Sequence, residues 1–287
     1  MVFAAAESMS ATNSALAGGA ALIACAFALS TADRWQKRRQ PHELAWTIAM
    51  VLFAIGSGAL WWAESAGWNL TVFRIFFLAG AVLNVAWLAL GTVYLLGGVS
   101  MGNKIRWWLV GLTGFATGIV AVAPTKQSII PTEFPTGKEV FGVAPRVLAA
   151  VGSGVPALVI IVGALWSAWR VLRKKTPALS TTASRSVVSP WRLAVGNVLI
   201  ALGTLVLSAS GTLAGRLGKD QAFAVTLLVG VSVLFTGFMV ASNSTRVRST
   251  QRATQYLARA TSWYRLDNQH FRRALVARNV FLTPLDH

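Results

Sequence analysis

The sequence has few charged residues, histidines and cysteines, and each shortage excludes a class of chemistry. Only 12% of its 287 residues are charged, whereas globular proteins average about 25%. A single cysteine, Cys25, allows no intramolecular disulfide and no cysteine-based metal site, so cysteine usage does not indicate the compartment. The three histidines, His42, His270 and His287, lie outside the long apolar runs. No predicted span therefore offers a pair of histidines to hold a membrane haem.

Several catalytic signatures are also missing. There is no H-E-x-x-H helix, no His/Asp/Glu cluster, and no Walker or Rossmann glycine motif. The last apolar run, 221–241, contains no lysine that could form a Schiff base with retinal. We therefore expect no cofactor and no metal, and we favour a non-catalytic protein. The enzyme alternative is lipid chemistry inside the membrane with Glu64 as acid or base, although a general base normally has an orienting partner.

Long apolar runs are what the sequence does contain, since 55% of its residues are hydrophobic. About 20 such residues in a helix cross a hydrocarbon core of about 30 Å. Residues 1–14 contain no Lys or Arg, so the first run is expected to be a retained span rather than a cleaved signal. The sequence predicts an all-α polytopic membrane protein, a seven-transmembrane-helix bundle within residues 1–241, with spans near 12–31, 44–63, 71–97, 106–123, 146–169, 192–214 and 221–241.

The basic residues predict the orientation of this bundle. The chain carries 26 Lys and Arg against 9 Asp and Glu, and most of the basic residues follow spans one, three, five and seven. Because short cytoplasmic loops are enriched in Lys and Arg, we expect the N-terminus outside and the C-terminus in the cytoplasm. The short loops and the absence of an appended domain favour a multi-pass protein of a bacterial plasma membrane.

The C-terminal segment 242–287 is predicted to be a basic amphipathic tail. Arginines alternate there with apolar residues that fall roughly on one helical face. Such a helix lies in the headgroup plane, where each arginine near an anionic leaflet contributes about 1 kcal/mol at most. We expect anionic lipid headgroups as its partner and no nucleic acid, because basic flanks are what membrane topology already demands.

Two ionisable residues flank the turn between spans two and three. Glu64 and Arg74 lie ten residues apart at the ends of antiparallel helices, so they are predicted to pair near the outer interface. The pair is either a structural staple or the charged floor of an external pocket. Trp61, Trp62 and Trp68 would wall that pocket, since tryptophan favours the membrane interface.

Polar residues inside the spans complete the candidate site. Asn84, Trp87, Gly91 and Tyr94 recur at i, i+3, i+7 and i+10, which places them on one stripe of span three. Asn197 lies one to two turns inside span six. An asparagine in hydrocarbon needs a partner, and this partner is more often another helix than a substrate.

Two further patterns concern packing. Pro124, Pro131, Pro135 and Pro145 predict that 125–144 forms an irregular external cap over the bundle. The small residues at 114–118 and 211–215 let helices approach closely, either within the bundle or at a dimer face.

The sequence leads to two hypotheses of function. The first is a non-catalytic protein that binds or conducts a small or lipid-like ligand, with Glu64, Arg74, Asn84 and Asn197 orienting its polar part and the tryptophans covering its apolar part. The alternative is an accessory subunit or scaffold of a membrane complex, which would use its small-residue faces and its tail to bind partner proteins.

Overall fold

A computed structural model describes residues 2–173, 190–214 and 223–240. The predicted tail 242–287, residues 174–189 and the end of the 211–215 motif lie outside the described residues. Within these ranges the protein is helical, and its only strand-like pairing is an isolated bridge between Thr125 and Phe141. The helices are α1 (Val2–Arg38), α2 (Pro41–Ala66), α3 (Leu70–Phe76), a π-helix η1 (Phe77–Leu83), α4 (Asn84–Val122), α5 (Gly137–Val140), α6 (Val143–Arg173), α7 (Pro190–Ala214) and an unlabelled helix, Phe223–Val240.

Five of the described helical stretches are long and apolar enough to cross a membrane, which confirms the all-α, membrane-spanning class. They are Ala11–Arg38, Pro41–Ala66, Leu70–Val122, Val143–Trp169 and Phe223–Val240. A shorter apolar helix covers Ala194–Ser208. The second stretch begins at Pro41, a residue suited to the first helical turn. His42 and Glu43 therefore lie within it, which corrects the prediction that His42 is outside the apolar helices.

The stretch Leu70–Val122 is a helical hairpin that turns at Gly98. Gly98 has φ 82° and ψ 176°, a conformation that glycine adopts without the steric penalty of a Cβ atom. Residues 98–105 lie between the predicted spans 71–97 and 106–123, but from Val99 on the second arm of α4 is already helical there. The predicted loop between 97 and 106 is therefore wrong, because one glycine is enough to reverse the chain.

Hydrogen bonds join the two arms of this hairpin. They connect Tyr94 to Asn103 at 2.9 Å and Trp87 to Thr113 at 3.3 Å, and each pair has one residue on either side of Gly98. The Tyr94 ring lies over Gly102, where a Cβ atom would overlap it. The two arms are therefore antiparallel and held in register by polar side chains.

Small residues bring α1 and α2 together. Ala17, Ala20, Ala24 and Ala28 recur on one face of α1 and are buried. Ala45 and Ala49 are likewise buried on α2, which packs along α1. Such residues let helix backbones approach closely, which suits a bilayer, where lipid gives no hydrophobic drive for association.

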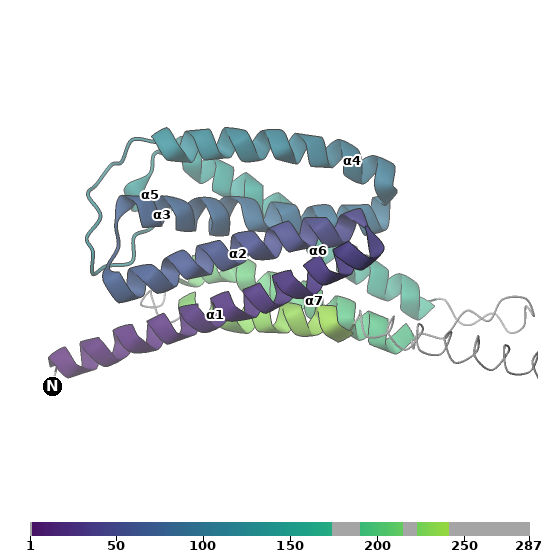
Figure 1. Ribbon diagram of the computed structural model, residues 1–287, viewed down its shortest axis with the longest axis horizontal. Coiled ribbons are helices and arrows are strands. Elements are labelled where there is room, and N and C mark those ends of the chain that lie inside the picture. Colours follow the sequence, from purple (N-terminus) through teal and green to yellow (C-terminus); the bar gives the residue numbers. More distant parts are fainter. Residues whose placement is uncertain (1, 174–189, 215–222, 241–287) are drawn as a thin grey trace, which may run out of the picture.

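The bundle has two different ends (Figure 1). The turns after α1 and at Gly98 lie at one end, and the turn after α2 lies at the other. Residues 123–142, called the cap below, fold at this second end and contain α5. The expected irregular cap is therefore present.

Candidate functional site

The described residues enclose a cavity of about 990 Å³ at the cap end of the bundle. A ligand site typically has about 300–1,000 Å³. Its walls come from α2, α3, η1, the start of α4, α6, α7, the helix Phe223–Val240 and the cap. Six phenylalanines supply most of its aromatic surface: Phe53, Phe73, Phe76, Phe77, Phe134 and Phe223. Several of these rings contact one another at centroid distances of 5.2–6.4 Å.

The π-helix η1 forms one wall and is held tightly on both sides. A Cβ atom at Gly56 would lie 3.1 Å from the Cα of Gly80, so α2 and η1 touch through their backbones. On the other side, a Cβ at Gly152 of α6 would lie 2.7 Å from the Val82 carbonyl oxygen. Short π-helical turns are frequent at functional sites. Here the two glycines fix the position of the residue that follows η1, Asn84.

Asn84 is the polar residue of the cavity wall whose hydrogen bonding is incomplete. It is 7% exposed, and its Oδ1 is buried without a hydrogen-bond partner. Buried polar atoms are nearly always paired, because an unpaired one costs about 1–3 kcal/mol. This oxygen is covered by protein atoms, so a ligand in the cavity would pair with it only after the Asn84 side chain turns.

Three buried or half-buried hydroxyls of the cavity wall already donate hydrogen bonds within the protein. Ser57, Ser153 and Thr204 each donate to the carbonyl four residues earlier in their own helix, at 2.7, 2.7 and 2.8 Å. This local pairing is common for Ser and Thr in helices. Each oxygen keeps lone pairs that can accept a further hydrogen bond.

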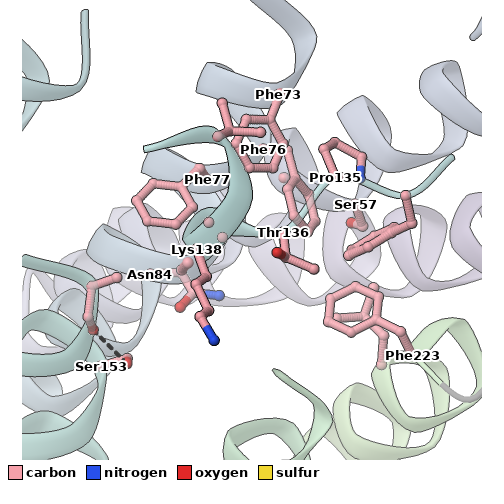
Figure 2. Close-up of a pocket in the computed structure, with 18 of the residues that line it drawn as sticks. Ser57, Phe73, Phe76, Phe77, Asn84, Pro135, Thr136, Lys138, Ser153 and Phe223 are labelled. Carbon is pink, nitrogen blue, oxygen red and sulfur yellow. Dashed lines mark hydrogen bonds between the residues drawn. The ribbon is translucent and has the colours of Figure 1, made fainter. Parts of the chain in front are cut away.

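The cap is fastened over the cavity by specific bonds. Trp68 N–H donates to the Pro131 carbonyl at 2.9 Å, which ties the cap to the turn after α2. The short α5 begins with a capping box between Thr136 and Glu139. Figure 2 shows the exposed Lys138 side chain extending from α5 into the cavity.

The structure shows a hydrogen-bond partner for Arg74 at the end of α4, and the predicted pair of Glu64 and Arg74 stays a prediction. Arg74 donates from Nη2 to the Ala123 carbonyl at 2.9 Å, at the end of the α4 hairpin. Neither residue lines the cavity.

The three tryptophans of the predicted pocket separate in the structure. Trp61 and Trp62 are 46% and 55% exposed, and Trp61 packs on Gly18 of α1. Trp68 is buried and contacts Phe76 and Phe134 of the cavity wall at 5.6 and 5.3 Å. Trp68 therefore supports the aromatic wall from behind.

The stripe on span three is divided between two roles. Asn84 lines the cavity, whereas Trp87 and Tyr94 bond across the α4 hairpin and Gly91 lies under the Trp46 ring of α2. Residues at i, i+3, i+7 and i+10 are spread over roughly 80° around the helix axis. That arc is wide enough for the four side chains to contact different helices. Asn197 donates to Ser167 on α6 at 2.9 Å and also lies away from the cavity.

Sequence reasoning missed a buried ionic cluster at the opposite end. Arg34 Nε lies 3.6 Å from Glu43 Oε2, and its guanidinium stacks 4.0 Å above the Phe238 ring. His42 Nε2 lies 3.8 Å from Glu43 Oε1. Nearby, Thr47 donates to Thr31 between the same two helices at 3.0 Å. The sequence could have predicted this pair, because Arg34 and Glu43 lie nine positions apart on either side of a tight turn.

The described residues contain no group of three or more His, Cys, Asp or Glu that could hold a metal ion. Comparison with protein-family models, with curated proteins and with solved structures found no match. The site must therefore be interpreted from its own geometry.

Proposed function

We propose that this chain is a multi-pass membrane protein that binds or conducts a small or lipid-like ligand through the cavity at the cap end. The observation that carries the proposal is the unpartnered Oδ1 of Asn84 in the wall of a 990 Å³ cavity rich in phenylalanine. Such a combination, mostly apolar with a few convergent polar groups, is typical of ligand sites.

The ligand is bound rather than chemically changed. Ser57, Ser153 and Thr204 donate to their own helices, so none of these three hydroxyls is paired with a base that would activate it. The cap would cover the ligand, and the Lys138 ammonium would contact its polar part near the entrance.

The proposal includes seven crossings with the N-terminus outside the plasma membrane. The hairpin at Gly98 supports it, since Leu70–Val122 has 53 residues, and Ala194–Ser208 would supply a short crossing. Thr132→Cys in the cap should react with a membrane-impermeant maleimide on intact cells, and Gln36→Cys only after lysis. A Cys25→Ser background removes the native thiol. The reverse pattern would contradict this orientation.

Ligand binding is tested by native mass spectrometry of the protein extracted gently from its membrane. We expect a stoichiometric small-molecule adduct that weakens in Asn84→Leu. The matched control is Asn197→Leu, which removes a membrane asparagine bonded to Ser167 and outside the cavity. Gly80→Leu fills the cavity from η1, because a Cβ there meets nothing within 4 Å. An adduct that survives both Asn84→Leu and Gly80→Leu would exclude this cavity as its site.

A scaffold is the second candidate function, and one observation favours it. Gly114 and Gly118 lie on α4 with nothing within 4 Å of a Cβ atom, and Phe115 between them is 61% exposed. The described helices therefore do not use this small-residue face for packing. If the chain is a subunit, Gly114→Leu with Gly118→Leu, or deletion of 242–287, would release a protein partner and leave any small adduct in place.

A further inference from the structure

The charged residues that line the cavity all belong to the cap. They are Glu133, Lys138 and Glu139, and the cap adds the Gln127 amide and several hydroxyls. The lining residues that come from the other described helices carry no charge, and most of them are apolar. The lining is therefore amphipathic, with charges of both signs at the cap and an apolar surface between the helices.

The apolar part of the cavity extends far from the cap. Along one wall the lining runs from Phe73 of α3 to Leu88 of α4, and fifteen residues at about 1.5 Å each span about 20 Å. On the antiparallel helix α2, the contact of Gly56 with Gly80 places Met50 at nearly the depth of Leu88. Met50 and Leu88 are the lining residues farthest from the cap on these two helices.

Beyond this depth the described helices pack closely at three contacts, called the floor below. A Cβ atom on the glycine would overlap its neighbour at each one: Gly91 with Trp46, Gly163 with Leu96, and Gly203 with Leu234. These contacts join α4 to α2, α6 to α4, and α7 to the helix Phe223–Val240. None of the six residues lines the cavity. Met50 and Leu88 therefore lie between the cavity and a tightly packed part of the bundle.

We propose that the cavity holds an acyl-chain amphiphile with its headgroup under the cap and the end of its chain against Met50 and Leu88. A zwitterionic headgroup matches the lining charges, with a phosphate beside Lys138 and an ammonium beside Glu133. The cap fixes one end of the ligand and the floor limits the other, so Met50 and Leu88 determine the longest chain that binds. This inference rests on the proposed function, since it assigns the orientation and chain length of a ligand in the same cavity.

The test titrates lysophosphatidylcholines with chains from decanoyl to stearoyl, by native mass spectrometry of the full protein in a non-ionic detergent. Affinities are compared at equal mole fraction in the micelles, which cancels the transfer of each chain from water. We expect one optimal chain, and the next longer chain should bind about fivefold more weakly or worse, because extra methylenes must displace packed side chains.

Two substitutions should move this optimum in opposite directions. Leu88→Ala removes a side chain next to the floor and should shift the optimum to a longer chain. Val85→Phe fills the apolar part of the cavity one turn closer to the cap and should shift it to a shorter chain. The matched control is Leu90→Ala, which removes the same side chain from the same helix. Leu90 is 1% exposed and does not line the cavity, so the optimum should stay as in the native protein.

An affinity that rises through the stearoyl chain without an optimum would overturn the inference. So would an optimum that Leu88→Ala and Val85→Phe leave unchanged, or one that Leu90→Ala shifts equally. If Gly80→Leu abolished binding of every chain in those cases, the cavity would still be a ligand site and the proposed function would stand. If Gly80→Leu left binding unchanged, the proposed function would fail together with the inference. Thermal unfolding shows whether each variant is folded, and Val85→Phe tests the inference if Leu88→Ala is not.

Discussion

The buried pair of Arg34 and Glu43 gives the sharpest test of how this bundle is stabilised. The side chains are 15% and 5% exposed, and the pair closes the turn between α1 and α2. Two unit charges at about 4 Å attract by about 4 kcal/mol at an effective dielectric constant of 20. Desolvation offsets much of that attraction, so the pair contributes little relative to well-packed apolar residues.

Removing one partner is a different perturbation, because it leaves the other charge buried. Glu43→Gln should destabilise the protein by about 3 kcal/mol, in the range expected for breaking a buried pair. The Phe238 ring beneath the guanidinium would offset a small part of that loss. The double change Arg34→Leu with Glu43→Leu should recover most of the stability, since neither charge then remains.

The assay is equilibrium unfolding by SDS in mixed micelles, with all variants in one double-mutant cycle. The exposed pair of Asp33 and Lys37, at 2.8 Å, is the matched control. Asp33→Asn should change the free energy of unfolding by less than about 0.5 kcal/mol. The reasoning would be refuted if Glu43→Gln matched this control, or if the two leucine substitutions destabilised additively.

Two further predictions concern the packing of α4. Gly91→Leu should prevent folding, because even a Cβ atom there would overlap the Trp46 ring. Gly114→Leu should leave stability unchanged, since its Cβ atom meets open space. Gel filtration and thermal unfolding measure the folding of each variant, and equal damage by the two substitutions would contradict the packing described. Trp87→Phe removes the 3.3 Å hydrogen bond to Thr113 and should cost about 1 kcal/mol in SDS unfolding without affecting ligand affinity, because Trp87 does not line the cavity. A loss of affinity with unchanged stability would assign Trp87 to the ligand site instead.

The helical, membrane-spanning class could be predicted from composition, because long apolar runs leave few other structures for the backbone. The cap was also predictable, since its prolines exclude a regular helix. The contacts between particular side chains of different helices could not be predicted in this way. The run lengths place Glu64 and Arg74 at similar depth, but the direction in which Arg74 faces depends on where the α4 hairpin ends, at Ala123.

The cavity itself lay beyond sequence reasoning. It forms because η1 is held between glycines from α2 and α6 and because the cap folds over it, and both depend on residues far apart in the chain. Of the nine residues predicted for the site, Asn84 alone lines the cavity. It could be found because an asparagine in an apolar run is conspicuous. The phenylalanines of the cavity wall could not be identified from the sequence, since they resemble every other apolar residue of a membrane helix.

The one-residue turn at Gly98 has a consequence for how the chain enters the bilayer. With no loop between its arms, we expect the two halves of the stretch Leu70–Val122 to enter a bilayer together as a pair. The indole N–H of Trp87 and the hydroxyl of Tyr94 have partners on the opposite arm, so they are satisfied before any other helix arrives. The hairpin thus pairs these two polar groups within itself and does not depend on the remaining helices for them.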